Sequence, residues 1–161
     1  MKLKPLLILF FSVCFLIFFS SVTTGETTLG GALENDFTGD ELWYGGYLRT
    51  GGLIKLELGG LRSESSNSKV TRLFSYLLLD LNLGSLGTNT GSLHLYLGGS
   101  PDMTLNADES SFSFSDSSGF GKAGLSLRIF PLSIQVQATG KFDFSGNLTS
   151  LFGGVGLGLT F

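Results

Sequence analysis

A serine and the only histidine of the chain stand two residues apart in an alternating segment. Ser92 and His94 share one face of the expected strand with Tyr96, because side chains in a strand alternate faces with period two. A hydroxyl nucleophile needs a base within hydrogen-bond reach and a third group that orients the base. Glu57 or Asp80 is the candidate orienting acid, so these residue types would suit nucleophilic catalysis by serine.

The composition indicates a surface that does not face water alone. Only 14% of the 161 residues are charged and 24 are glycine, whereas a soluble domain usually has about 25% charged residues. The net charge of −3 and the lack of a Lys/Arg run argue against a nucleic-acid partner. The length suits one domain. Cys14 is the single cysteine, which excludes disulfides and cysteine metal sites from the mature protein if this segment is removed.

The first 25 residues have the pattern of a secretory signal peptide. Lys2 and Lys4 precede an uncharged apolar run over residues 6–19, and residues 20–25 are small or polar. We expect cleavage after Gly25, which leaves residues 26–161 as the folded domain. A retained membrane anchor and a lipoprotein modified on Cys14 are the alternatives. The apolar run is shorter than the roughly 20 residues of a spanning helix, which disfavours the anchor.

The remainder of the chain alternates apolar and polar residues between clusters of turn-forming residues. No segment shows a convincing helical period. The sequence therefore predicts an all-β domain of eight strands, as in a small antiparallel transmembrane barrel. These strands are expected at residues 27–35, 41–50, 52–62, 69–83, 91–100, 119–130, 132–144 and 148–161.

Strand 132–144 separates its faces most clearly, with Ile134 and Val136 on one side and Gln135 and Gln137 on the other. When this register is extended through the sheet, the strand charges fall on a single face. They are too sparse to cover the exterior of a soluble, lipocalin-like secreted barrel, which is the alternative. Inside a narrow barrel they can form a paired network. The predicted interior residues are Glu34, Arg49, Lys55, Glu57, Arg72, Asp80, Lys122, Arg128, Lys141 and Asp143.

The final segment, GGVGLGLTF, carries an apolar stripe that ends in an aromatic residue. Its outward positions are Val155, Leu157, Leu159 and Phe161, with Gly156 between them. This ending resembles the closing strand of bacterial outer-membrane β-barrels. The whole mature region resembles the small eight-stranded barrels of the OmpA transmembrane domain and OmpX type. In that family the assembly machinery reads the final strand, so the resemblance implies that these five residues form an assembly signal.

The resemblance further implies a monomer with both termini in the periplasm and with lipopolysaccharide and outer-membrane lipids around it. On this orientation the periplasmic turns lie at residues 51–52, 84–91 and 131. The outer loops lie at residues 36–40, 63–68, 101–118 and 145–147. The long loop 101–118 is then the expected contact surface for a partner.

The sequence also predicts roles for the glycines within strands, the aromatic residues near strand ends and the acidic residues of the loops. Glycines within strands should make room for large inward side chains. Aromatic residues near strand ends should form interfacial girdles; they are Trp43, Tyr44, Phe112, Phe114, Phe120, Phe130, Phe142, Phe144, Phe152 and Phe161. Acidic loop residues could hold Ca²⁺ or Mg²⁺, although a solvated acidic rim is favoured; they are Asp36, Asp40, Glu41, Glu64, Asp102, Asp108, Glu109 and Asp116.

The sequence thus predicts an outer-membrane barrel with a plugged polar interior and a structural or surface-interaction role, without catalysis. No cofactor and no resident metal are expected. His94 is interpreted as a hydrogen-bonded interior residue, because a position in the middle of the barrel would hide it from lipid. A lipid A-modifying enzyme, a narrow pore and the soluble barrel remain the alternatives.

Overall fold

Alternating residues form long antiparallel strands in the computed structural model, which describes residues 25–65, 68–87, 91–106 and 111–161. Residues 1–24 of the predicted signal peptide, which covers residues 1–25, lie outside the described residues. Within the described ranges no helix is long and apolar enough to cross a bilayer. The same ranges contain eight strands: β1 (Glu26–Asp36), β2 (Glu41–Gly51), β3 (Ile54–Ser65), β4 (Ser68–Leu86), β5 (Gly91–Asn106), β6 (Ser111–Ile129), β7 (Leu132–Asp143) and β8 (Leu148–Thr160).

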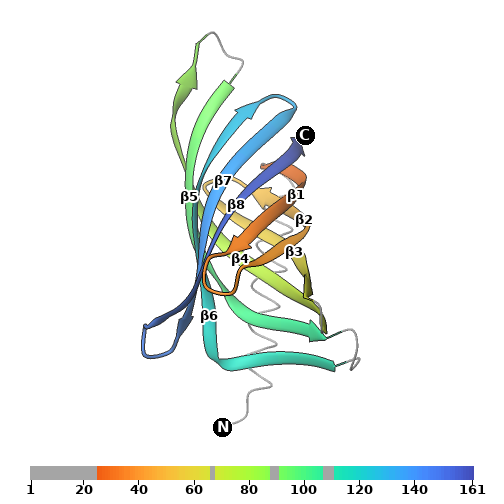
Figure 1. Cartoon of the computed structure of the whole chain (residues 1–161). Helices are drawn as coiled ribbons and strands as arrows, with labels where there is room; N and C mark the ends of the chain where they lie inside the picture. Colours follow the sequence, from red (N-terminus) through yellow and green to blue (C-terminus); the bar gives the residue numbers. More distant parts are fainter. Residues whose placement is uncertain (1–24, 66–67, 88–90, 107–110) are drawn as a thin grey trace.

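The sheet closes on itself. Each strand pairs with its neighbours in sequence, and β8 returns to pair with β1, so the expected closed antiparallel barrel is confirmed (Figure 1). At the seam, Thr28 and Thr160 are joined by a hydroxyl hydrogen bond of 2.9 Å. The Phe161 N–H donates to the Thr27 carbonyl at 2.9 Å, and the Thr27 N–H donates to the Phe161 carbonyl at 3.2 Å. Closure satisfies backbone groups that an open sheet edge would leave unpaired.

The two ends of the barrel are distinguished by the chain segments they carry. We call the end that holds Glu26, the β2–β3 turn and Phe161 the terminal end; it lies at the top in Figure 1. The opposite, loop end carries the β1–β2, β3–β4, β5–β6 and β7–β8 connections. This partition agrees with the expected one. Among the connections that the structure describes in full, residues 52–53 and 130–131 at the terminal end are shorter than residues 37–40 and 144–147 at the loop end.

The segment predicted as a long loop, residues 101–118, is mostly strand, which corrects the expectation. It extends β5 and β6 as a hairpin that stays paired with β4 along β5 and runs past the end of β7 along β6, with Met103 paired to Phe114 and Leu105 to Phe112. The register shifts after Pro101, where the paired strand carries extra residues. Serines at alternate positions made this stretch resemble a loop, but alternating hydroxyl and aromatic residues also pair well across strands.

The barrel is apolar outside and charged inside. Val136 and Leu157 are 60% and 63% exposed, whereas Glu57 is completely buried. This is the reverse of a soluble protein, in which charged residues are almost never fully buried unless they are paired. The outward band suits a hydrocarbon environment.

Glycines opposite large inward side chains let the narrow interior fill. Tyr47 is the register partner of Gly30, and Tyr96 is the partner of Gly124. A Cβ on Gly124 would approach the Tyr96 side chain within 2.6 Å of its ring. Tyr96 therefore covers the backbone of the next strand, a cross-strand arrangement that fixes register.

Some of the aromatic residues expected at interfacial girdles lie inside instead. Phe120 and Phe152 are 5% exposed and pack in the interior together with Trp43. They occupy positions of the strand alternation that point inward. This alternation decides whether a side chain faces the interior or the exterior, however near it is to a strand end. Other predicted girdle residues, including Phe130 and Phe144, are strongly exposed.

Candidate functional site

The centre of the interior is organised around one fully buried carboxylate. Glu57 of β3 accepts hydrogen bonds from Arg49 of β2 at 2.7 Å and from Lys122 of β6 at 2.6 Å. Arg49 also donates to the Gln135 side-chain oxygen at 2.9 Å. Charges from strands on different sides of the barrel therefore meet across the lumen and fill it. Buried charges are tolerated when they are paired and hydrogen-bonded in this way.

A second cluster lies nearer the loop end. Glu34 of β1 pairs with Arg72 of β4 and accepts hydrogen bonds from Gln137 at 2.7 Å and Thr139 at 3.0 Å. The Arg72 guanidinium lies 4.6 Å from the Phe152 ring centroid, with the Phe120 and Trp43 rings also close. These rings supply cation–π attraction in a region closed to water.

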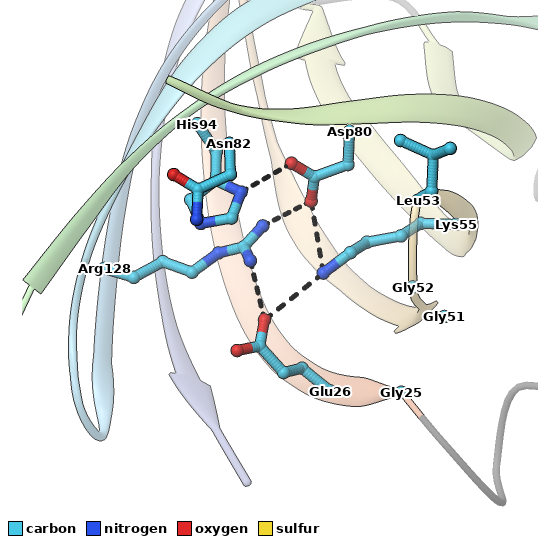
Figure 2. A pocket seen from close by; sticks show the side chains of 10 residues that line it. All are labelled: Gly25, Glu26, Gly51, Gly52, Leu53, Lys55, Asp80, Asn82, His94 and Arg128. Carbon is cyan, nitrogen blue, oxygen red and sulfur yellow. Dashed lines mark hydrogen bonds and ion pairs between the residues drawn. The ribbon is translucent and has the colours of Figure 1, made fainter. Parts of the chain in front are cut away.

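A third cluster lies at the terminal end. Asp80 of β4 pairs with Arg128 of β6 and with Lys55 of β3, whose Nζ lies 3.1 Å away. Glu26, the first residue of β1, bridges the same two cations, at 2.6 Å from Arg128 and 3.4 Å from Lys55 (Figure 2). The Glu26 side chain is 55% exposed, so it forms a carboxylate rim over a buried ion cluster. Glu26 was not among the predicted interior residues, although it lies an even number of positions from Glu34 on the same strand and therefore faces the same side.

The remaining predicted network residues lie near the loop end. Lys141 is partly exposed and pairs with Asp102 at 2.8 Å. Asp143 does not join the network: its carboxylate accepts hydrogen bonds from the backbone and side-chain nitrogens of Asn147 and shapes the β7–β8 turn. The other eight predicted residues lie in the three clusters described above.

Asp102 belongs to the acidic set predicted for the loops, yet it is buried. Asp108 and Glu109 of that set lie outside the described residues. Among the residues that the structure describes, no group of three or more His, Cys, Asp and Glu side chains is arranged to hold a metal ion.

His94 connects the terminal cluster to a serine. Its Nδ1 lies 2.8 Å from Asp80 Oδ1, and its Nε2 lies 2.9 Å from the Ser92 hydroxyl. Of the two acids considered from the sequence, Asp80 therefore contacts His94, whereas Glu57 belongs to the central cluster. The histidine also lies closer to an opening than expected, because it lines a cavity at the terminal end rather than the middle of the barrel.

That cavity has a volume of about 250 Å³ and is open to the outside. Figure 2 shows its wall, with Asn82 beside His94 and with Lys55 and Arg128 reaching across toward Glu26. Its lining residues come from the start of β1, the β2–β3 turn, the start of β3, the second half of β4, the start of β5 and the end of β6. The arrangement combines a hydroxyl, an imidazole, a carboxylate and two cations at one mouth of a closed barrel.

A closed antiparallel sheet with a paired charged interior and an apolar exterior defines a transmembrane-type β-barrel. The described residues have the fold of the small eight-stranded outer-membrane barrels. The N-terminal β-barrel domain of Pseudomonas aeruginosa OprF is similar at a TM-score of 0.56 and 14% identity, over 84% of this chain and 97% of that one. A de novo designed transmembrane β-barrel also gives a TM-score of 0.56, at 12% identity over 84% and 95% of the two chains.

Neisserial surface protein A is similar at a TM-score of 0.48 and 13% identity, over 84% of this chain and 94% of that one. No family model matches the sequence, and no match was found among curated proteins. At these identities the likeness concerns the fold, so function must be argued from the residues.

Proposed function

We propose that the protein is an outer-membrane β-barrel with a plugged interior and a structural or surface-interaction role. One observation carries the proposal: the exterior is apolar around the closed sheet, while the strand charges pair inside it. An Arg or Lys facing lipid at the midplane costs about 2–4 kcal/mol in such barrels. The inward position of these charges avoids that cost, and leucine, isoleucine and valine meet the acyl chains.

The ion clusters support the plugged state. The Glu34, Glu57 and Asp80 clusters follow one another along the lumen. The inward side chains of Tyr76 and Tyr96 are almost completely buried there. At the Glu34 and Glu57 clusters, opening a path for solutes would require separation of buried charges that have no water to replace their partners. This favours a barrel that anchors and presents surface segments over a diffusion pore.

In the proposed orientation the terminal end faces the periplasm and the loop end faces outward. An N-terminal signal peptide would direct export, and the barrel assembly machinery would read β8. The β5–β6 hairpin, with Phe112 and Phe114 exposed, is the outer segment best suited to contact lipopolysaccharide or a partner. We expect a monomer, because the closed sheet offers no free strand edge for pairing.

Fractionation tests the location and the fold together. The protein should sediment with the outer membrane and should migrate faster on a gel before boiling than after, because a closed barrel resists unfolding by detergent. Recovery in the soluble periplasmic fraction with the same mobility before and after heating would contradict the proposal and favour a soluble secreted barrel.

Removal of Phe161 tests the assembly signal. The truncated protein should accumulate less in the outer membrane of cells, because it loses the terminal aromatic residue as well as the two hydrogen bonds with Thr27. Its yield in the membrane is measured by fractionation, and its folding in detergent by the shift in gel mobility.

Phe130 provides the matched control, since it is a strongly exposed aromatic residue at the same end of the barrel. Phe130→Ala should insert normally. If removal of Phe161 impairs folding in detergent and insertion in cells equally, the residue acts in the seam rather than as a signal.

A further inference from the structure

The terminal mouth holds a serine, a histidine and an aspartate in an ordered hydrogen-bond chain that the structural role does not use. Ser92 Oγ lies 2.9 Å from His94 Nε2, and His94 Nδ1 lies 2.8 Å from Asp80 Oδ1. Both ring nitrogens are therefore engaged in the order that serine hydrolases require: the acid holds Nδ1–H, and Nε2 is left to accept the hydroxyl proton. We propose that Ser92, His94 and Asp80 form a hydrolytic site for small anionic esters that enter through the terminal end.

The fold fixes this geometry rather than leaving it to mobile side chains. Ser92 and His94 are alternate inward residues of β5, so their side chains lie on one face. Asp80 comes from the adjacent strand β4 and is held from its other oxygen by Lys55 and Arg128. Its remaining oxygen is directed to His94. Support from rigid strands and from a second set of contacts is what a preorganised site needs.

Access distinguishes this serine from the buried hydroxyls of the lumen. His94 lines the open cavity of about 250 Å³, and Ser92 is partly exposed at the start of β5, where it pairs with β4. By contrast, Ser126 and Ser133 hydrogen-bond to each other in the closed interior and have essentially no exposure. A substrate can therefore reach the imidazole without unfolding of the plug.

The lining of the same cavity includes one side-chain amide, Asn82, that can donate a hydrogen bond to the charge that develops on an attacked carbonyl. Asn82 pairs with His94 across β4 and β5, and its side-chain oxygen accepts a hydrogen bond from the Gly84 N–H at 2.9 Å. That contact assigns the Asn82 oxygen as acceptor and leaves the amide nitrogen as the donor. Such preorganised amide donors stabilise an oxyanion.

The charges of the cavity indicate the substrate class. Lys55 and Arg128 face it, and the exposed Glu26 carboxylate bridges both cations (Figure 2). A carboxylate or phosphate on the substrate can exchange with Glu26 and gain the same charge-assisted hydrogen bonds. The cavity volume limits the substrate to a small ester with one negatively charged group.

The reaction consumes one water and needs no redox partner. Ser92 Oγ forms a bond to the acyl carbon while its proton passes to His94 Nε2. The ester C–O bond then breaks, and the leaving alcohol takes the proton from His94, which leaves an acyl-serine. Water attacks this intermediate, gives its proton to His94, and displaces Ser92 Oγ, which recovers that proton. The products are one carboxylic acid and one alcohol.

The test uses the full chain folded in detergent, with a fluorophosphonate probe and with the 4-nitrophenyl esters of acetate and succinate. The folded protein should be labelled and should hydrolyse the succinate ester faster than the acetate ester. Ser92→Ala should abolish labelling and lower kcat/KM by about 100-fold or more, and His94→Gln should do the same, because loss of the base removes general-base catalysis.

Ser85→Ala is the matched control, because Ser85 is the exposed register partner of Ser92 on β4. It should keep wild-type labelling and hydrolysis. Heat-dependent gel mobility confirms that every variant is folded. The proposal is overturned if folded wild-type protein is not labelled, or if labelling survives Ser92→Ala. Neither result bears on the fraction with which the protein sediments. The hydrolytic site can therefore be disproved while the proposed membrane location still stands.

Discussion

Replacement of Glu57 by Gln is expected to destabilise the barrel by about 3–5 kcal/mol, since removal of one partner of a buried ion pair leaves the other charge uncompensated. Here one carboxylate serves two cations: Arg49 and Lys122 both donate to Glu57, and all three side chains are at most 4% exposed. The free energy of unfolding can be measured by urea titration of the folded protein in detergent. The fluorescence of Trp43, the only tryptophan, reports the transition.

The matched variants separate lost pairing from lost packing. Lys122→Met removes one cation but leaves Glu57 paired with Arg49, so it should cost less than Glu57→Gln. In the double variant Glu57→Gln/Lys122→Met a single uncompensated cation remains, and the two effects should not add. Lys141→Gln breaks an ion pair whose lysine side chain is 35% exposed, and should change stability by only about 0–1 kcal/mol. If Glu57→Gln is as mild as Lys141→Gln, the lumen is hydrated and the plug is not dry.

Period-two alternation was enough to assign most interior charges to one face from the sequence. Glu34, Glu57 and Arg128 fall at inward positions simply by counting from neighbouring apolar residues, and the structure buries them. The same counting places Glu26 inward, but its position at the edge of the first strand gave no sign that it would bridge two cations. Alternation gives the face of a residue and not its height in the barrel.

Partners across the lumen depend on register and on the tilt of the strands, which alternation does not contain. Asp80 and Glu57 are both inward acids on neighbouring strands, so the sequence left both open as partners of His94. The structure selects Asp80 through the pairing of Asn82 with His94, just before the register shift at Gly84. The location of the Ser92 site near a mouth, instead of in the middle of the barrel, follows from the same register.

The β5–β6 hairpin shows a second limit. Its residues alternate as a strand should, but serine at every second position and a proline at the start are also typical of loops. Pairing with a partner strand decided the outcome, and Pro101 is accommodated at the register shift. The sequence therefore predicted the correct end of the barrel for this segment, but it predicted a loop where the structure has strands.

The adjacent glycines Gly98 and Gly99 of β5 should differ in how far alanine destabilises the barrel: strongly at Gly98 and hardly at all at Gly99. A Cβ on inward Gly98 would overlap the carbonyl oxygen of Leu77 on β4 and would lie 2.8 Å from its carbonyl carbon. These are backbone atoms that cannot rotate away, so Gly98→Ala must push β4 and β5 apart. We expect a loss of about 1–3 kcal/mol or more, as for overpacking of a tight interior. Urea titration in detergent measures it.

Gly99→Ala is the internal control, because its Cβ would meet only the Phe120 carbonyl oxygen, at 3.4 Å. Both substitutions add one methyl group to the same strand and restrict the unfolded chain to the same extent. Their difference in stability therefore measures the close approach of β4 and β5 at Gly98 alone. Gly99→Ala should stay within about 0.5 kcal/mol of the wild type. Equal effects at the two positions would mean that the strands are farther apart at Leu77 than this register requires, and the height of Asp80 relative to His94 would then be in question as well.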